Sequence, residues 1–266
     1  MCIRDSSEMD IDALIFSGHK TYAPGSPGVV IARKNLIGKI EPEEVGGGMV
    51  DRVFPEKYYV TNKFPNREEA GTPNILGAIT LGTAIHVLHK VGMKNVLDED
   101  TKLTHYCLKE MLKIADIVIY GETCTDTCPR AGTISFNIKR LNHGLVAAIL
   151  NDYFNIAVRN ECFCAHPYVK EMIMDDLLDF VDSVDIDDIE EVYQLKRGMV
   201  RASFALYSRE SDVDALITAI KDIAARKDYY RSQYEIDNND EYIHSSFRFD
   251  HAETFSVQDT VSSLVS

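Results

Sequence analysis

Residues 13–24 read Ala-Leu-Ile-Phe-Ser-Gly-His-Lys-Thr-Tyr-Ala-Pro, and this stretch decides the first part of the fold. An apolar run gives way abruptly to polar and turn-forming residues, which is typical of a buried strand that ends in a loop. A second apolar run at 29–31 predicts another short strand. Because little chain precedes them, we expect the two strands to be the end of a larger sheet.

Helical and strand patterns alternate further along the chain. Thr72 as N-cap and Pro73 at the first helical position predict a helix that ends at Gly92, and Asp98 as N-cap predicts a second over 98–115. The remaining patterns predict strands over 117–120, 133–138, 156–159 and 200–206, and helices over 145–154 and 211–226. Strands that alternate with helices indicate a layered α/β domain.

These patterns divide the chain into three expected parts. Residues 1–95 are expected to be the C-terminal part of a larger domain whose N-terminal half is missing, with residues 1–6 as an artefactual leader. Residues 96–226 are expected to form a small α/β domain. Residues 227–266 hold eight acidic and three basic residues among tyrosines and phenylalanines. We expect an extended tail there, docked in part by its aromatic side chains and disordered in part.

The composition excludes several classes of partner. The 266 residues include 28 Lys and Arg against 42 Asp and Glu, a net charge of −14, which disfavours sequence-independent binding to nucleic acid. The longest apolar stretch, 75–88, contains Gly, Thr and His and is shorter than the roughly 18 residues of a membrane helix, so no membrane partner is expected. Six cysteines without an export signal fit reduced thiols and a cytoplasmic location.

Lys20 lies where the first predicted strand gives way to its loop, and ligands of open α/β sheets bind at that end of the strands. Partial desolvation beside the strand would favour the neutral amine, which is the form that reacts with a carbonyl cofactor. An ordinary exposed lysine is the alternative. Ser17 and His19 can donate hydrogen bonds to a phosphate, or they can serve only the turn.

Five segments follow one another in an informative order. They are Ser-Gly-His-Lys-Thr-Tyr-Ala-Pro at 17–24, Gly-Gly-Gly-Met at 46–49, Arg-Glu-Glu-Ala-Gly-Thr-Pro-Asn at 67–74, Val-Arg-Asn-Glu-Cys-Phe-Cys-Ala-His-Pro at 158–167 and Val-Arg-Ala-Ser at 200–203. Together they resemble the pyridoxal-phosphate-dependent class V aminotransferase family, in its cysteine desulfurase and selenocysteine lyase branch. The resemblance implies the fold type I architecture of these transferases, with the end of the large cofactor domain followed by a small C-terminal α/β domain.

The resemblance also implies how the cofactor would be held. Lys20 would bind pyridoxal 5'-phosphate as a Schiff base, with Ser17 and His19 at its phosphate. Gly71 and Thr72 would reach the phosphate of the partner subunit's cofactor, since family members are homodimers with shared active sites. The start of a helix suits a phosphate because its N–H groups are unpaired.

In the same resemblance, Arg159 and Arg201 would bind the carboxylate of the amino-acid substrate through their paired guanidinium donors. Cys164 would accept sulfur, so the implied activity is a cysteine desulfurase that forms L-alanine and an enzyme persulfide. A sulfur-acceptor protein is a further candidate partner. Arg159 would favour the Cys164 thiolate and Glu161 would oppose it.

A zinc site is the rival interpretation of the cysteines. Structural zinc sites prefer two Cys separated by two to four residues. Cys124 and Cys128 fit this spacing, whereas Cys162 and Cys164, followed by His166, do not. We therefore expect no bound metal.

Two departures from the family pattern leave alternatives open. The family usually has Gly where Glu161 stands, and often His where Cys162 or Phe163 stands. The carboxylate that pairs with the pyridine nitrogen and the ring that stacks on the cofactor lie upstream of the lysine motif in the family. We therefore expect the chain as given to be truncated, inactive and weak in binding the cofactor. A class V aminotransferase or epimerase reaction without Cys164 stays open, as does a non-catalytic fragment or assembly partner.

Overall fold

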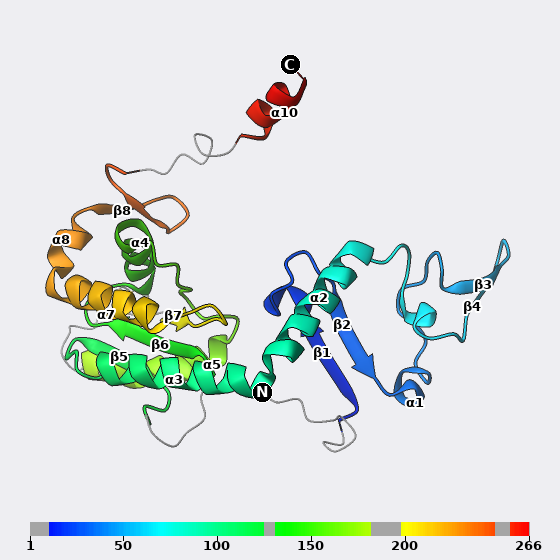
Figure 1. Cartoon of the computed structure of the whole chain (residues 1–266), viewed down its shortest axis with the longest axis horizontal. Coiled ribbons are helices and arrows are strands. Elements are labelled where there is room, and N and C mark those ends of the chain that lie inside the picture. Colours follow the sequence, from blue (N-terminus) through cyan, green and yellow to red (C-terminus); the bar gives the residue numbers. More distant parts are fainter. Residues whose placement is uncertain (1–10, 125–130, 182–197, 248–255, 266) are drawn as a thin grey trace. The chain divides into compact units, whose positions relative to one another are not determined.

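The computed structural model describes residues 11–124, 131–181, 198–247 and 256–265. Contacts between Cα atoms divide the chain into two compact units, Met1–Leu97 and Asp98–Ser266, which we call the first and second unit (Figure 1). The division falls two residues after the boundary expected between residues 95 and 96.

The first unit opens with a two-stranded antiparallel sheet. β1 (Ala13–Ser17) pairs with β2 (Gly28–Ala32), so that Ser17 lies opposite Gly28. The short helix η1 (Gly18–Lys20) follows β1 directly. The sequence predicted a buried strand here, but the Ile15 side chain is 73% exposed. Within the described residues β1 pairs with β2 alone.

The rest of the first unit consists of α1 (Lys34–Ile37), the antiparallel strands β3 (Val50–Val53) and β4 (Tyr58–Val60), η2 (Asn66–Glu68) and α2 (Ile75–Val91). The predicted N-cap Thr72 is wrong, because the carboxamide of Asn74 accepts a hydrogen bond from the Gly77 amide at 2.9 Å and caps α2 instead. The predicted end at Gly92 is confirmed. No described helix alone is long and apolar enough to cross a bilayer, although α2 and the next helix, α3 (Met93–Met111), which are joined through a bend, meet that length and composition together.

The second unit is built on an antiparallel sheet of three strands. β6 (Thr133–Ile138) lies between β5 (Ile117–Tyr120) and β7 (Val200–Ser203) (Figure 1). The strand predicted over 156–159 is wrong, since only Arg159 pairs with the sheet, as an isolated bridge to Arg201. Its helices are most of α3, which begins at Met93 in the first unit and ends at Met111, together with α4 (His143–Phe154), α5 (His166–Val181), α7 (Glu210–Ala225), α8 (Lys227–Arg231) and α10 (Val257–Val265). The helix predicted to begin at Asp98 therefore starts earlier, at Met93.

The core of the second unit lies between this sheet and its helices. Burial alternates along β6, and its inward side chains Ile134, Phe136 and Ile138 are almost fully buried. They belong to one apolar cluster with residues of α3, α4 and α7, including Ile149 and Ile220. Period-two burial on a strand against period-3.6 helices is the packing expected of an α/β layer.

The segment after residue 226 differs from the extended tail expected there. α8 is followed by the antiparallel strands β8 (Tyr234–Ile236) and β9 (Tyr242–His244). Tyr230 is fully buried in the main cluster, and its hydroxyl donates to Asp222 at 2.5 Å. Aromatic side chains thus dock this segment, because each removes a large apolar surface from water and keeps a partner for its hydroxyl.

We expect Tyr230→Ala to lower the free energy of unfolding by about 3–5 kcal/mol, as for other large buried aromatic side chains. Tyr229→Ala is the matched control, because Tyr229 is 48% exposed, and it should cost about 1 kcal/mol or less. Urea unfolding followed by circular dichroism measures both. Equal losses in the two variants would show that residues 227–247 are not part of the core.

Candidate active site

The lysine motif forms a tight turn at the end of β1. Gly18 is buried, whereas His19 and Lys20 are exposed, so the partial desolvation expected for Lys20 is wrong for the described residues. The Thr21 amide donates to the Gly18 carbonyl at 2.8 Å and closes the turn. A Cβ at Gly18 would lie 2.2 Å from the Ser26 hydroxyl oxygen, so only glycine fits there.

The loop after Lys20 is tied to the start of α2. The Asn74 carboxamide nitrogen donates to the Gly25 carbonyl at 2.7 Å, while its oxygen caps the helix. Gly77 packs against the same point, since a Cβ there would lie 2.6 Å from the Gly25 oxygen. The lysine motif and the 67–74 motif are therefore held together by the Asn74 side chain, which binds both segments, and by the close backbone approach at Gly77.

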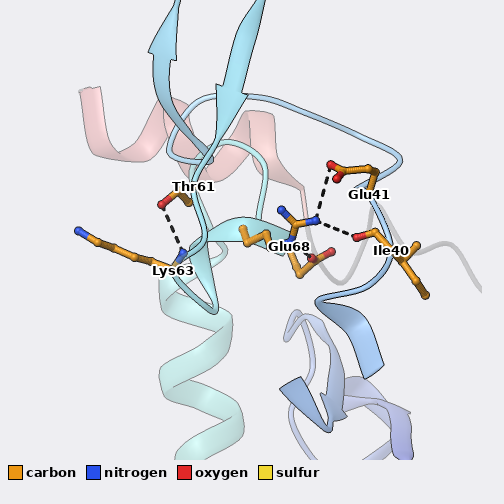
Figure 2. Close-up of polar contacts among 6 residues, drawn as sticks. Ile40, Glu41, Thr61, Lys63 and Glu68 are labelled. Carbon is orange, nitrogen blue, oxygen red and sulfur yellow. Dashed lines mark hydrogen bonds and ion pairs between the residues drawn. The ribbon is translucent and has the colours of Figure 1, made fainter. Parts of the chain in front are cut away.

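The 46–49 and 67–74 motifs also join. Gly71 takes a left-handed φ of 77°, and its amide donates to the Gly47 carbonyl at 2.8 Å. Upstream of it, the buried Arg67 guanidinium donates to the Ile40 carbonyl at 2.8 Å. Figure 2 shows Glu41 and Glu68 around this contact, and they form ion pairs with Arg67 at 3.6 and 3.3 Å. Arg67 thus anchors the segment that presents the exposed Gly71 and Thr72.

The second unit brings the two predicted substrate arginines together. The Arg159 amide donates to the Arg201 carbonyl at 3.1 Å, and the Arg201 amide donates to the Arg159 carbonyl at 2.7 Å. Residues directly opposite each other in an antiparallel pair point to the same face, so the two side chains share one face. The Arg159 guanidinium donates to the Cys164 sulfur at 3.4 Å, and the Arg201 guanidinium carbon lies 4.9 Å from the centre of the Phe163 ring.

The cysteine loop is held in an unusual backbone conformation. Glu161, Phe163 and Cys164 have positive φ values of 75°, 52° and 62°. Each such residue that is not glycine costs about 1–3 kcal/mol, and strain of this kind persists where the surroundings impose it. Here the Met199 amide donates to the Glu161 carbonyl at 3.1 Å, and a Cβ at Gly198 would lie 2.6 Å from the Glu161 Cα.

Arg159 and Arg201 bring two positive charges to this site. Within the described residues neither Arg159 nor Arg201 forms an ion pair, and the buried Nε of Arg201 has no hydrogen-bond partner. Like charges on directly opposite residues repel, and a buried unpaired donor costs free energy. The arrangement is suited to an anion that accepts from both guanidinium groups, such as a carboxylate.

The other thiols are chemically distinct from Cys164, which is exposed. Cys107 is fully buried in the core, and burial raises the pKa of its thiol to about 12. Cys128 lies outside the described residues. Over the part of the chain that the structure describes, no group of three or more His, Cys, Asp or Glu side chains could hold a metal ion.

The predicted site residues therefore fall into two sets, each assembled within its own unit. Ser17, His19, Lys20, Gly71 and Thr72 belong to the first unit, and Arg159, Cys164 and Arg201 to the second. Sequence reasoning missed Asn74, Gly198 and the stacking of Phe163 on Arg201. No signal in the sequence predicts the role of Phe163. A glycine permits close approach of another backbone segment, so Gly198 could have been identified as a candidate for such a contact.

The second unit has an α/β fold, and the two sets of residues lie within motifs that indicated the family. The aminotransferase class-V family matches residues 3–216, which is most of the chain. The chain belongs to this family, and the predicted family and fold class are confirmed.

Curated relatives of this chain are cysteine desulfurases. That of Escherichia coli O127:H6 is 31% identical over 219 residues, covering 82% of this chain and 47% of the relative. That of Wigglesworthia glossinidia brevipalpis is 33% identical over 216 residues, covering 81% of this chain and 46% of the relative. The chain spans about half the length of the curated relatives it matches.

Solved structures give the same picture. The cysteine desulfurase CsdA from Escherichia coli is 26% identical with a TM-score of 0.66, covering 84% of this chain and 48% of that protein. The apo cysteine desulfurase from Thermococcus onnurineus NA1 is 28% identical with a TM-score of 0.66, covering 83% and 48%. A C-DES variant with glycine covalently linked to its PLP cofactor shares the fold at 17% identity and a TM-score of 0.57, covering 82% and 48%.

We expect Gly77→Ala to loosen the loop after Lys20, because the added Cβ would meet the Gly25 carbonyl. The clash should cost about 1–3 kcal/mol and exceed the roughly 1 kcal/mol that alanine gains in a helix. Gly82→Ala is the matched control in the same helix, since nothing lies within 4 Å of its added Cβ. Hydrogen exchange should become faster at residues 21–28 in Gly77→Ala alone, and unchanged exchange there would contradict the link.

Proposed function

We propose that this chain carries the cofactor lysine, the substrate-binding arginines and the sulfur-accepting cysteine of a cysteine desulfurase. The reaction would convert L-cysteine to L-alanine and leave a persulfide on Cys164. The observation that carries the proposal is the hydrogen bond from Arg159 to the Cys164 sulfur, made beside Arg201 on one face of the chain. The cysteine desulfurases among its relatives support it.

The arginine pair would bind and orient the substrate carboxylate. A guanidinium presents donors in a fixed planar fork that matches the two oxygens of a carboxylate. The unpartnered Nε of Arg201 supplies one donor, and Phe163 limits the positions of that guanidinium by stacking on it. The backbone bridge fixes the spacing of the two arginines, so little side-chain freedom would be lost on binding.

Cys164 would act as the nucleophile toward the substrate sulfur. The reactive form is the thiolate, and a guanidinium that donates to the sulfur stabilises its negative charge. The thiol is exposed, on a turn that presents it to a ligand. Arg159 would therefore serve both the substrate carboxylate and the Cys164 thiolate.

The residues of the first unit fit pyridoxal 5'-phosphate, the cofactor of the class V family. Lys20 is exposed, and within the described residues no acidic side chain pairs with it, so its amine is accessible to the cofactor aldehyde. Ser17 precedes the turn and His19 lies within it, and both would hold the phosphate. When bound, the cofactor withdraws electrons from the substrate Cα. Lys20 would then take the Cα proton and return it as general base and acid.

The proposal extends to the setting of the enzyme. The homodimer with shared active sites would bring the exposed Gly71 and Thr72 to the partner's cofactor phosphate. Exposed apolar side chains of the first unit, such as Ile15 and Leu76, support burial against further protein. A cytoplasmic location is supported by the described cysteines, none of which forms a disulfide. A sulfur-acceptor protein would collect the persulfide sulfur.

In the active enzyme that contains this chain, Lys20 should carry the cofactor after reduction with borohydride in the presence of pyridoxal 5'-phosphate. Only an amine that forms a Schiff base is trapped in this way. Tryptic mapping should find the adduct on the peptide that contains Lys20. Lys20→Ala should lose it, whereas Lys34→Ala should keep it. An adduct on another lysine would remove Lys20 from the site.

Cys164→Ser should abolish sulfide release from L-cysteine in the active enzyme that contains this chain, because serine cannot hold sulfur as a persulfide. Sulfide assays measure the release, and the cofactor absorbance should still change when cysteine is added. Cys124→Ser, outside the loop, is the control and should retain activity. Full release from Cys164→Ser would favour a class V aminotransferase or epimerase instead.

A further inference from the structure

The turn that carries Cys164 also carries a second thiol. The Ala165 amide donates to the Cys162 carbonyl at 2.7 Å, which closes a turn over 162–165. Its two central residues, Phe163 and Cys164, both have positive φ, as in a type I′ turn. Cys162 therefore stands at the first position of the turn and Cys164 at the third.

The turn brings the two Cα atoms to a separation that suits a disulfide. Consecutive Cα atoms lie about 3.8 Å apart, and in a turn the first and fourth Cα atoms lie within about 7 Å of each other. The Cα atoms of Cys162 and Cys164, two residues apart in this turn, are therefore about 5–6 Å apart. Disulfides bridge Cα atoms about 4.4–6.8 Å apart.

The surroundings of the two thiols differ in a way that assigns their roles. Cys164 is exposed and accepts the hydrogen bond from Arg159. Cys162 is partly buried against a small apolar cluster that includes Val169 and Met199. The exposed thiol is accessible to a sulfur donor, while the partly buried thiol is less accessible to external reagents.

We propose that Cys162 is a resolving thiol for a persulfide on Cys164. The Cys162 thiolate attacks the inner sulfur of the persulfide and forms the Cys162–Cys164 disulfide. The bond between the two persulfide sulfurs breaks, and its electron pair leaves with the outer sulfur as hydrosulfide. The Cys162 proton goes to solvent. In catalysis the persulfide comes from the proposed desulfurase reaction, on which the inference rests to that extent.

This step changes what the enzyme delivers. Without Cys162, the persulfide remains on Cys164 until an acceptor removes its outer sulfur. With it, sulfur leaves as hydrosulfide, whose charge the nearby Arg159 stabilises, and the loop is left oxidised. Two equivalents of a small thiol, oxidised in turn to their disulfide, restore both cysteines. A disulfide closed across a strained turn is readily reduced, which suits such a cycle.

The test treats the reduced 266-residue chain with inorganic polysulfide, so that neither cofactor nor substrate is needed. After gel filtration and alkylation, trypsin releases residues 160–170, and this peptide contains Cys162 and Cys164 as its only cysteines. In the unmodified chain we expect the peptide without alkyl groups and about 2 Da below its dithiol mass, together with released sulfide. Cys162→Ser should instead keep a Cys164 persulfide, about 32 Da heavier and removable by dithiothreitol.

Cys124→Ser is the matched control and should behave as the unmodified chain. Cys162→Ala repeats the main test with an apolar replacement that suits the cluster, and circular dichroism verifies that each variant is folded. A stable persulfide on Cys164 beside an alkylated Cys162 in the unmodified chain would overturn the inference. A Cys164 that takes up no sulfur in any variant would overturn it as well. Loss of desulfurase activity alone would affect the proposed function and leave this result intact.

Discussion

The two backbone hydrogen bonds between Arg159 and Arg201 are the constraint on which the site of the second unit depends. They attach the segment after α4 to β7, and β7 belongs to the sheet that forms the core. Because directly opposite residues share a face, the bridge places two guanidinium groups together despite their repulsion. The packing of the sheet against its buried helices supplies the free energy that offsets this repulsion.

The cysteine loop is an extension of the same bridge. Beyond Arg159 the chain turns sharply, and the bond from Met199 to Glu161 returns it to the strand that leads into β7. Asn137 of β6 donates to the Gly198 carbonyl at 3.0 Å, so the support reaches the central strand of the sheet. Cys164 lies in a loop, but these hydrogen bonds attach the loop to the sheet.

The sequence was sufficient for the family and the α/β class, because five short motifs keep their order and their spacing. The roles of Lys20, Cys164 and the other motif residues stay predictions. Local sequence signals failed where a contact with a distant residue determines the structure. Thr72 and Pro73 form a complete helix-start signal, yet Asn74 caps α2 while it also donates to the Gly25 carbonyl, 49 residues away. The left-handed backbone at Glu161, Phe163 and Cys164 was equally hidden, since none of these residue types favours it.

The close approach of Gly198 to the Glu161 backbone has a consequence for how this loop can vary. The Glu161 side chain is exposed, so the contact limits the backbone at position 161 rather than the size or charge of its side chain. Any side chain at position 198 would push the whole turn away from the strand. Gly198, the residue that must remain small, thus lies outside the cysteine loop whose backbone it shapes. The side chains of the loop can therefore change without a change in the backbone conformation of the loop.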